Sequence, residues 1–434
     1  MRNILVLGAG KSSIYLIDYL VKQASAQQWQ ITVADVSAEL ALQKTKNRKH
    51  TRALAFDFCS EAGRTALIRQ ADVVISMLPA AMHPTIARDC LRLRKHLVTP
   101  SYISQAMQEM DAAARERGLI FMNEIGLDPG IDHMSTMKII HALKAEGKTI
   151  TGYKSHCGGL IAPESDTNPW HYKFTWNPRN VILAGQGDGF IQYLEQGKKR
   201  KLKYEQLFSN PSALQVRGYG SFESYPNRDS LKYIGLYGLQ QVKTMYRGTL
   251  RRPLFCAGWQ WLVDLGFTGV QELDTAVFQK RVSRLLKTKA ALVPARVHQL
   301  LEATAVLPAL YNYTARTLVP AQLLQSVLEE QWALQPKDKD MVVMVHEFFY
   351  REGGTDKKRQ SSLVVLGDNQ EHTAMAKTVG LPLGMVTKLI LNQALKATGV
   401  LMPGDSEVYN PILAELETHG IAFKEKITKI QIAV

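Results

Sequence analysis

Short apolar runs alternate with stretches of helical periodicity over the first 130 residues of the chain. Apolar runs of strand length predict strands, whereas apolar residues spaced by three and four predict helices. We predict strands at residues 2–7, 30–35, 71–78, 96–99 and 119–124, with one more ending at residue 57, and helices at residues 14–21, 38–46, 86–93 and 103–117. Because strands alternate with helices, the expected fold class is α/β, with a Rossmann-type doubly wound parallel sheet and right-handed crossovers.

This alternation ends near residue 128. Beyond it we predict helices at residues 135–145, 282–286, 298–304, 321–331 and 373–397, and strands at residues 172–176, 181–184, 341–350, 361–366 and 421–434. The strands at 341–350 and 361–366 form a hairpin. The mixture predicts a larger, mixed α/β (α+β) second domain. The expected domains are residues 1–127, 128–395 and 396–434, and the sequence leaves open whether the last segment returns to the first domain.

Glycines and polar residues stand at the carboxyl ends of the predicted parallel strands. In open α/β sheets a ligand lies outside that edge, where the strand order reverses. Gly8 and Gly10 let the backbone approach a pyrophosphate, and the N-terminus of the next helix offers N–H groups to phosphate oxygens. The residues that we expect to bind a dinucleotide cofactor are Gly8, Gly10, Lys11, Ser12, Ser13, Asp35, Asp57, Ser76 and Leu78.

The acidic residue at the end of the second strand bears on which dinucleotide binds. Asp35 is placed to accept hydrogen bonds from ribose hydroxyls and would repel a 2′-phosphate. No arginine occupies that strand end, so we expect NAD rather than NADP. The glycine motif is incomplete, because Ser13 stands where GxGxxG has its third glycine, and a plain tight turn is the alternative. For Asp57 the alternative is a solvated turn residue.

Charge limits the classes of partner. The 434 residues include 53 Lys and Arg against 39 Asp and Glu, a net charge of +14, which favours nucleic acid, a membrane surface or a polyanionic small molecule. The basic runs at residues 44–52 and 198–203 lack interleaved aromatics and match no nucleic-acid-binding motif, so solvated loops are favoured. No uncharged apolar run reaches the length that spans a bilayer. We therefore expect a small-molecule partner, and neither nucleic acid nor a membrane.

Cysteine and histidine spacing predicts no metal site. The four cysteines lie far apart without a CxxC pair, as is typical of reduced thiols in the cytoplasm, and the first residues do not form a signal peptide. The expected localisation is therefore cytoplasmic. His133, His156 and His171 stand at unrelated spacings, so we expect no metal. The absence of a G-x-S-x-G motif gives little support to hydrolase chemistry.

A long motif follows the sixth predicted strand. Residues 122–133 read MNEIGLDPGIDH. Further motifs follow in order at residues 157–160, 163–164, 168–169, 172–176, 225–230, 246–251, 346–348 and 373–380. In these motifs the sequence resembles saccharopine dehydrogenases of the glutamate-forming type (saccharopine reductases) over nearly the whole chain.

The resemblance implies a Rossmann domain, a mixed α/β domain for substrate binding and dimerisation, a saccharopine site between them, and a homodimer. It also implies an oxidoreductase reaction of lysine metabolism, the reversible oxidation of saccharopine with water to L-glutamate and α-aminoadipate semialdehyde. Fungal members use NADPH and carry an arginine just after the second strand. This sequence has Asp35, Val36 and Ser37 there, which favours NAD and the lysine-degrading direction.

Saccharopine carries three carboxylates and a secondary amine, so its site needs cationic and N–H donors. Arg228 is the best candidate for a bidentate carboxylate clamp. Asp128 can hold the substrate amine and is the first candidate for the base that accepts its proton, ahead of Asp132, His133 or a water. The expected catalytic residues are Asp128 and His133, and the expected substrate-binding residues are Ser101, Tyr102, Asp128, Cys157, Gly158, Asn168, Arg228 and Thr249.

Structural roles compete with these assignments. Arg228 could be a surface residue paired with Asp229, and Asp128 before a Pro-Gly pair is a good turn former. His133 could be a helix-cap or interface histidine, and Cys157 a packing thiol.

Three alternative functions stay open at the level of sequence. A sister dehydrogenase would act on another secondary amine, such as a carboxynorspermidine-type polyamine. A non-catalytic NAD-binding regulator would keep the cofactor site but lose turnover. A nucleic-acid-binding protein is suggested only by the net charge of +14.

Overall fold

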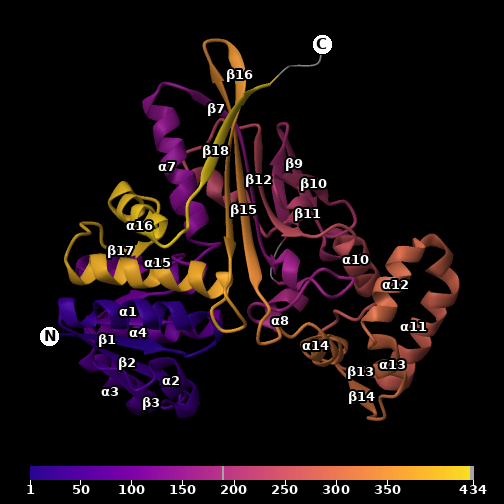
Figure 1. The fold of residues 1–434 in the computed structure, drawn as a ribbon, viewed down its shortest axis with the longest axis horizontal. Coiled ribbons are helices and arrows are strands. Elements are labelled where there is room, and N and C mark those ends of the chain that lie inside the picture. Colours follow the sequence, from indigo (N-terminus) through magenta and orange to yellow (C-terminus); the bar gives the residue numbers. More distant parts are fainter. Residues whose placement is uncertain (188–189, 431–434) are drawn as a thin grey trace. The chain divides into compact units, whose positions relative to one another are not determined.

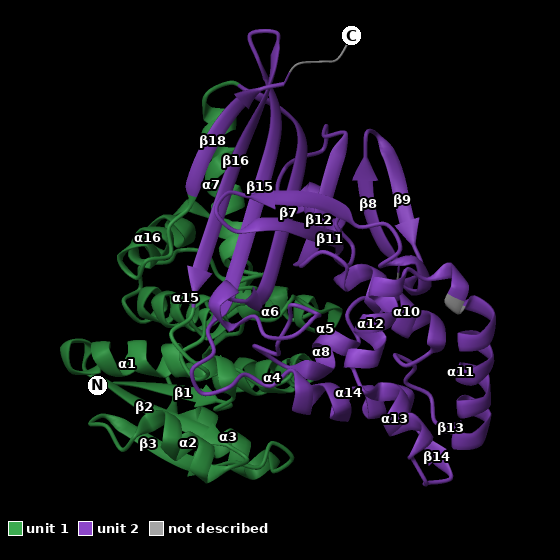
Figure 2. Ribbon diagram, turned by 45° about the vertical axis from the view of Figure 1, so that its right-hand side comes forward, with its two compact units in different colours: residues 1–147, 367–423 green, residues 148–366, 424–434 purple. Residues whose placement is uncertain are grey.

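The computed structural model describes residues 1–187 and 190–430. The chain folds into two compact units (Figure 2). Unit 1 comprises Met1–Gly147 and Gly367–Phe423, and unit 2 comprises Lys148–Leu366 and Lys424–Val434. These bounds differ from the domains expected above, since residues 128–147 and 367–395 belong to unit 1.

Unit 1 is built on a seven-stranded parallel sheet with the order β17-β6-β5-β4-β1-β2-β3 (Figure 1). All six strand pairs are parallel. The strands are β1 (Arg2–Leu7), β2 (Trp29–Asp35), β3 (Thr51–Ala55), β4 (Val73–Ser76), β5 (His96–Val98), β6 (Ile120–Met122) and β17 (Gly399–Leu401). The order reverses between β1 and β4, the switch point at which open α/β sheets bind ligands. The predicted doubly wound sheet is confirmed.

Helices cover this sheet with apolar faces that the periodicity largely predicted. They are α1 (Ile14–Gln27), α2 (Ala38–Thr45), α3 (Glu61–Gln70), α4 (His83–Leu93), α5 (Gln105–Gln108), α6 (Asp111–Glu116), α7 (Ile131–Ala145), α15 (Ala374–Leu391) and α16 (Ser406–Thr418), with the 3-10 turns η1 (Lys11–Ser13) and η2 (Ala80–Met82). The helix expected at residues 103–117 is two helices, and α3 was not predicted. α5 ends at Gln108 and α6 begins at Asp111, and both Met107 and Met110 are buried in the core of the unit.

Residues 396–430 divide between the two units. The short strand β17 adds to the edge of the parallel sheet beside β6, and α16 packs on α7 and α15 in unit 1. The last strand, β18 (Lys424–Lys429), pairs with β16 in unit 2. By length and composition α15 could cross a membrane, with a mean hydropathy of 1.3 over 18 residues, but 72% of it is buried inside the protein, as in the core helix of a soluble protein.

Unit 2 contains a mixed nine-stranded sheet, with the central order β10-β11-β12-β7-β15-β16-β18. Its strands besides β18 are β7 (Thr149–Ile161), β8 (Ile191–Glu195), β9 (Lys198–Leu202), β10 (Ser212–Val216), β11 (Gly220–Pro226), β12 (Thr244–Arg251), β15 (Asp340–Glu352) and β16 (Thr355–Leu366). β12 runs parallel to β7, and β15 runs antiparallel to it. The predicted hairpin is confirmed, with Glu352 paired to Thr355 across two glycines. The mixed α/β second domain expected from the sequence is therefore confirmed.

An aromatic helical layer completes unit 2. Its helices are α8 (Pro178–Ile182), α9 (Lys232–Leu236), α10 (Phe255–Leu265), α11 (Thr275–Lys289), α12 (Ala295–Ala303), α13 (Val306–Tyr311) and α14 (Pro320–Gln331), beside the small pair β13 (Leu273–Asp274) and β14 (Thr317–Leu318). The strand expected at residues 172–176 is irregular, and the rings of Tyr172 and Phe174 pack against Trp332, the first edge-on and the second tilted. The strand expected at 181–184 is wrong as well, since Asn177 caps a helix there.

Candidate active site

The turn after β1 has the shape that a dinucleotide site requires. Gly8 has a φ of +101°, and a Cβ on it would lie 3.1 Å from the Met77 carbonyl oxygen, so a larger residue would be strained and crowded. Gly10 has no heavy atom within 4 Å of its would-be Cβ, so its backbone is open to a ligand. Ser13 closes the turn, with its Oγ donating to the Gly10 carbonyl at 2.8 Å. This turn therefore fits a pyrophosphate at the start of α1.

Asp35 serves the same turn with both carboxylate oxygens. Its Oδ2 accepts from the Ala9 N–H at 2.7 Å and its Oδ1 from the Ser37 N–H at 3.0 Å. The carboxylate thus ties the glycine turn to the end of β2. Asp57, expected as a second contact, accepts from the Cys59 N–H at 2.9 Å, which is the turn role that was its alternative.

A buried histidine joins the ends of β4 and β5. The Ser76 Oγ lies 2.9 Å from His83 Nδ1, while the Ser101 and Thr99 hydroxyls lie 2.8 and 3.0 Å from Nε2. His83 is 3% exposed, and its burial lowers its pKa to about 4, so the ring is neutral near pH 7. The His83 ring thus hydrogen-bonds both Ser76, which we expect at the cofactor, and Ser101, which we expect at the substrate.

His83 was not predicted from the sequence. Its partners at residues 76, 99 and 101 come from two strand ends, and no local motif links them to it. The only signal was its place at the start of the helix after β4. Leu78 lies in the same strand-to-helix connection and is partly buried.

The shifted His83 pKa makes unit 1 sensitive to acid. An unfolded histidine has a pKa near 6.5, whereas in the fold the value is about 4. As the pH falls below 6.5 the unfolded chain gains a proton that the folded chain does not, so stability present above pH 6.5 is lost. The free energy of unfolding of the wild type falls between pH 7 and pH 5. We expect this fall to be about 2 kcal/mol smaller in His83→Gln. Urea titrations of the wild type and the variant at both pH values would measure it, and an equal loss of stability in the two proteins would assign the acid sensitivity to other groups.

The motif after β6 folds into a buried turn. Glu124 accepts from the Ile103 N–H through Oε1 at 2.9 Å, and its Oε2 lies 2.8 Å from His133 Nε2. Asp132 accepts from the Gly130 N–H at 2.6 Å. His133 and Asp132 have no exposed surface, so both hold the turn from inside and neither reaches a solvent-facing site.

Asp128 stands at the tip of this turn and is half-buried. The Tyr102 hydroxyl donates to its Oδ1 at 3.1 Å. Tyr102 follows β5 and Asp128 follows β6, so the two expected substrate residues of adjacent strand ends meet. Ser101, held by His83, precedes Tyr102. The structure thus brings Ser101, Tyr102 and Asp128 to the carboxyl edge of the sheet in unit 1.

In unit 2 the expected substrate residues fall into two groups. Cys157 on β7 is the pairing partner of Thr249 on β12, which pairs in turn with Tyr225 on β11. Cys157 is 6% exposed. Gly158 packs on β12, because a Cβ there would lie 2.7 Å from the Leu250 carbonyl oxygen. Cys157 and Thr249, both expected at the substrate, are therefore cross-strand neighbours in one sheet.

The other group lies in loops. Arg228 is exposed just after β11, with a φ of +52°. The neighbouring Asp229 accepts from the Gln192 side chain and from the Leu231 N–H, each at 2.8 Å. Asn168 uses both amide atoms locally, accepting from the Trp170 N–H and donating to the Tyr172 carbonyl. Asn168 thereby shapes its own loop.

Two arginines on β12 belong to the motif at residues 246–251, and the sequence offered no reason to assign them a role. Residues two apart on a strand share a face, so Arg247 and Arg251 flank Thr249 on the same side. They are 3% and 4% exposed. The Arg247 guanidinium lies 4.3 Å from the ring centre of Tyr233, and that of Arg251 lies 4.8 Å from that of Tyr172. Buried guanidiniums on aromatic rings give this face a positive potential.

Within residues 1–187 and 190–430, no group of three or more His, Cys, Asp or Glu side chains gathers in a way that could hold an ion.

Comparison with known families settles what kind of protein this is. Residues 4–122 match the family model of the saccharopine dehydrogenase NADP binding domain, and residues 126–421 match that of the saccharopine dehydrogenase C-terminal domain. The chain belongs to the saccharopine dehydrogenase family. The sequence resemblance is thereby confirmed.

Individual relatives of this saccharopine dehydrogenase family member agree along its length. It is 32% identical to a "saccharopine dehydrogenase [NADP(+), L-glutamate-forming]" of Pyricularia oryzae, over 98% of this chain and 99% of the relative. It is 33% identical to a mitochondrial alpha-aminoadipic semialdehyde synthase of Mus musculus, of which it spans only 48%. Apo saccharopine dehydrogenase (L-Glu forming) of Saccharomyces cerevisiae superposes with a TM-score of 0.85 at 30% identity, over 99% and 100% of the two chains. This match confirms the fold class.

The expected preference for NAD is wrong. The matching family model describes an NADP binding domain, and the fungal relatives from Pyricularia oryzae and Saccharomyces cerevisiae are named as NADP(+) enzymes. The physical reason lies in Asp35. The inference required a carboxylate turned toward a ribose, whereas both oxygens of Asp35 accept from backbone N–H groups of the turn. An acid at this strand end therefore does not select the dinucleotide.

Proposed function

We propose that this protein is an NADP(+)-linked oxidoreductase acting on a CH–NH bond, a saccharopine dehydrogenase of the L-glutamate-forming type. The observation that carries the proposal is the match over essentially the full length of both partners to fungal enzymes with that name. The glycine turn and the Asp128–Tyr102 pair support it from the structure.

The reaction follows from the substrate's chemistry. The C–H bond beside the secondary amine breaks with loss of a hydride, the amine loses its proton, and a C=N bond forms. Water then adds to the imine carbon, and the C–N bond breaks to release L-glutamate and α-aminoadipate semialdehyde. The bound nicotinamide would supply the hydride acceptor. Gly8, Gly10, Lys11, Ser12 and Ser13 would hold its dinucleotide, with Ser76 and Leu78 at the next strand end.

Asp128 is proposed to hold the amine and to take its proton. Its carboxylate is half-buried at the sheet edge, where a hydride acceptor of this fold lies. The Tyr102 hydroxyl donates to Oδ1 and so orients the carboxylate. His133, one of the two expected catalytic residues, acts here by positioning, since Glu124 and His133 brace the turn from inside.

We propose that cationic and polar residues of unit 2 bind the carboxylates of the substrate. We assign the bidentate clamp to Arg228, whose exposed guanidinium stands on a strand-end loop. Thr249, with Cys157 beside it, offers a hydroxyl on a face that Arg247 and Arg251 make positive. A substrate poor in carboxylates would gain little from this arrangement.

The decisive experiment measures initial rates of cofactor reduction. We expect saccharopine to be oxidised with NADP(+), and a carboxynorspermidine-type polyamine to be turned over at least about 100-fold more slowly, because unmatched buried donors are costly. Turnover of the polyamine without turnover of saccharopine would replace this proposal with the sister dehydrogenase. Binding of NADP(+) without turnover of any amine would favour the regulator. The homodimer and the cytoplasmic localisation stay proposals beside it.

A further inference from the structure

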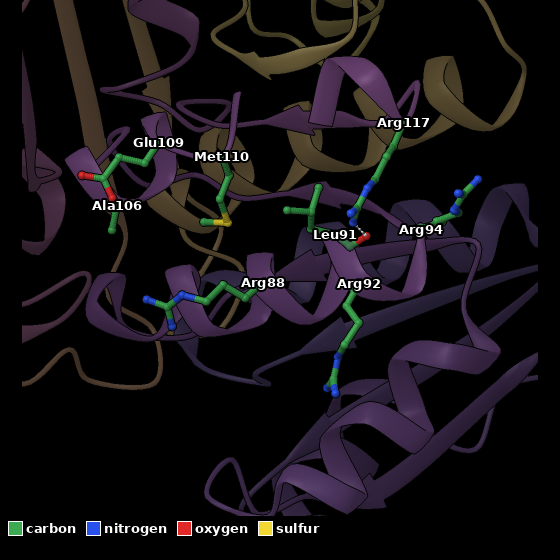
Figure 3. Close-up of a pocket in the computed structure, with 8 residues that line it drawn as sticks. All are labelled: Arg88, Leu91, Arg92, Arg94, Ala106, Glu109, Met110 and Arg117. Carbon is green, nitrogen blue, oxygen red and sulfur yellow. Dashed lines mark hydrogen bonds between the residues drawn. The ribbon is translucent and has the colours of Figure 1, made fainter. Parts of the chain in front are cut away.

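Unit 1 has a basic pocket on α4, with a cavity volume of about 510 Å³. Figure 3 shows its lining side chains, with Arg88 and Arg92 on α4, Arg94 just after it, and Arg117 just before β6. Among the residues that the structure describes, Glu109 is the one acid in the lining. Four guanidinium groups against one carboxylate leave the pocket strongly positive.

The pocket does not belong to the site described above. α4 begins at His83, beside the carboxyl ends of β4 and β5, and runs back to the amino end of β5. Arg94 lies two residues before β5, and Arg117 lies three residues before β6. Arg94 and Arg117 therefore stand at the amino edge of the sheet, opposite the edge where the glycine turn and Asp128 lie.

Ordinary structural roles account for only part of this charge. Arg117 donates to the Leu91 carbonyl at 2.7 Å, and Arg92 donates to the Asp89 carboxylate at 2.8 Å and to the Glu61 carboxylate at 3.4 Å. Each bond uses one of the five N–H donors of a guanidinium. The side chains of Arg88 and Arg94 have no hydrogen bond or ion pair within residues 1–187 and 190–430.

The arrangement of the cations also points to an absent anion. Arg88 and Arg92 are four residues apart on one helix, a spacing at which like charges repel and weaken the helix. Basic residues at a helix C-terminus are normal, which explains Arg92 and Arg94 at the end of α4 and Arg117 at the end of α6, but not Arg88. A bound anion would relieve the repulsion.

The floor of the pocket is apolar. Leu91 and Met110 lie between the arginines in Figure 3, and Met110 is also part of the core beneath. A single inorganic ion would leave these side chains uncovered. A ligand that fits has an apolar or ring portion for Leu91 and Met110 and two or more anionic groups that reach the guanidiniums.

We propose that this pocket binds a small organic polyanion, with phosphate or carboxylate groups, at a second site of unit 1. Guanidinium forks bind both groups in a bidentate manner, so the chemistry of the pocket is shared by the two. The site is independent of the proposed reaction and is tested by binding alone.

The experiment titrates ATP and citrate into the full chain by calorimetry without NADP(+), because NADP(+) is itself an organic polyanion that could occupy the pocket. We expect one of the two probes to bind one-to-one with a dissociation constant below about 1 mM at low salt. Binding is expected to weaken at least about tenfold in the Arg88→Gln/Arg94→Gln double variant, and to weaken as salt is raised. Tighter binding of ATP would identify a phosphate ligand, and tighter binding of citrate a polycarboxylate.

A charge-matched double variant controls for net charge. Arg52→Gln/Arg69→Gln removes two exposed arginines of unit 1 outside the pocket and is expected to bind within about twofold of the wild type. Equal loss of binding in both double variants would overturn the proposal, because it would mean a non-specific charge effect. Undiminished binding in Arg88→Gln/Arg94→Gln, or no binding of either probe to the wild type, would overturn it as well.

Discussion

Asp128→Asn is expected to lower kcat/KM for saccharopine by roughly 10²- to 10⁴-fold, the usual range for loss of a general base. Asparagine keeps the shape and an oxygen that can accept from Tyr102, but it cannot take a proton. Initial rates over a range of pH would measure the effect. If Asp128 accepts the amine proton, the acidic limb of the wild-type profile is absent in the variant.

Two variants make this result specific. Tyr102→Phe keeps the carboxylate but loses the 3.1 Å bond that orients it, so a smaller loss, with the acidic limb retained, is expected. Asp72→Asn changes a carboxyl just before β4, at the opposite edge of the sheet, and is expected to leave kcat/KM unchanged. A rate for Asp128→Asn within about threefold of the wild type would assign the proton to another group.

The parallel sheet of unit 1 was predictable because its central strands are buried on both faces. β1 and β4 are apolar runs for that reason, and helices with a clear apolar stripe separate them. β7 of unit 2 was missed, although it lies at the centre of its sheet. It mixes Lys154, His156 and three glycines among its apolar residues, so neither alternation nor an apolar run marks it. β17 is three residues long, too short to carry a pattern.

Site residues that are neighbours in the chain were predictable, and those assembled from distant segments were not. The glycine turn and the motif around Asp128 are local, so their chemistry can be read from consecutive residues. His83 gains its role only from Ser76, Thr99 and Ser101, which the fold brings to it. Asp35 was placed correctly at the end of its strand, but its role was misjudged. Both of its carboxylate oxygens accept hydrogen bonds from backbone N–H groups.

The turn that carries Asp128 depends on a glycine at position 130. A Cβ on Gly130 would lie 2.1 Å from the Gly126 carbonyl oxygen, and the φ of +147° is itself disfavoured for other residues. The clash is with backbone, which no rotamer change relieves. We expect Gly130→Ala to lower the free energy of unfolding by more than about 4 kcal/mol, or to prevent accumulation of folded protein. Urea unfolding followed by circular dichroism would measure it.

Gly147→Ala is the matched control for this substitution. Gly147 also has a positive φ, +69°, but no heavy atom lies within 4 Å of its would-be Cβ. Its replacement therefore isolates the conformational cost, about 1 kcal/mol, from the steric one. If the two variants unfolded at the same urea concentration, the close approach of Gly126 and Gly130 would not be what fixes the turn. A large difference between them would instead mean that the close approach of the Gly126 and Gly130 backbones is what fixes the turn that carries Asp128.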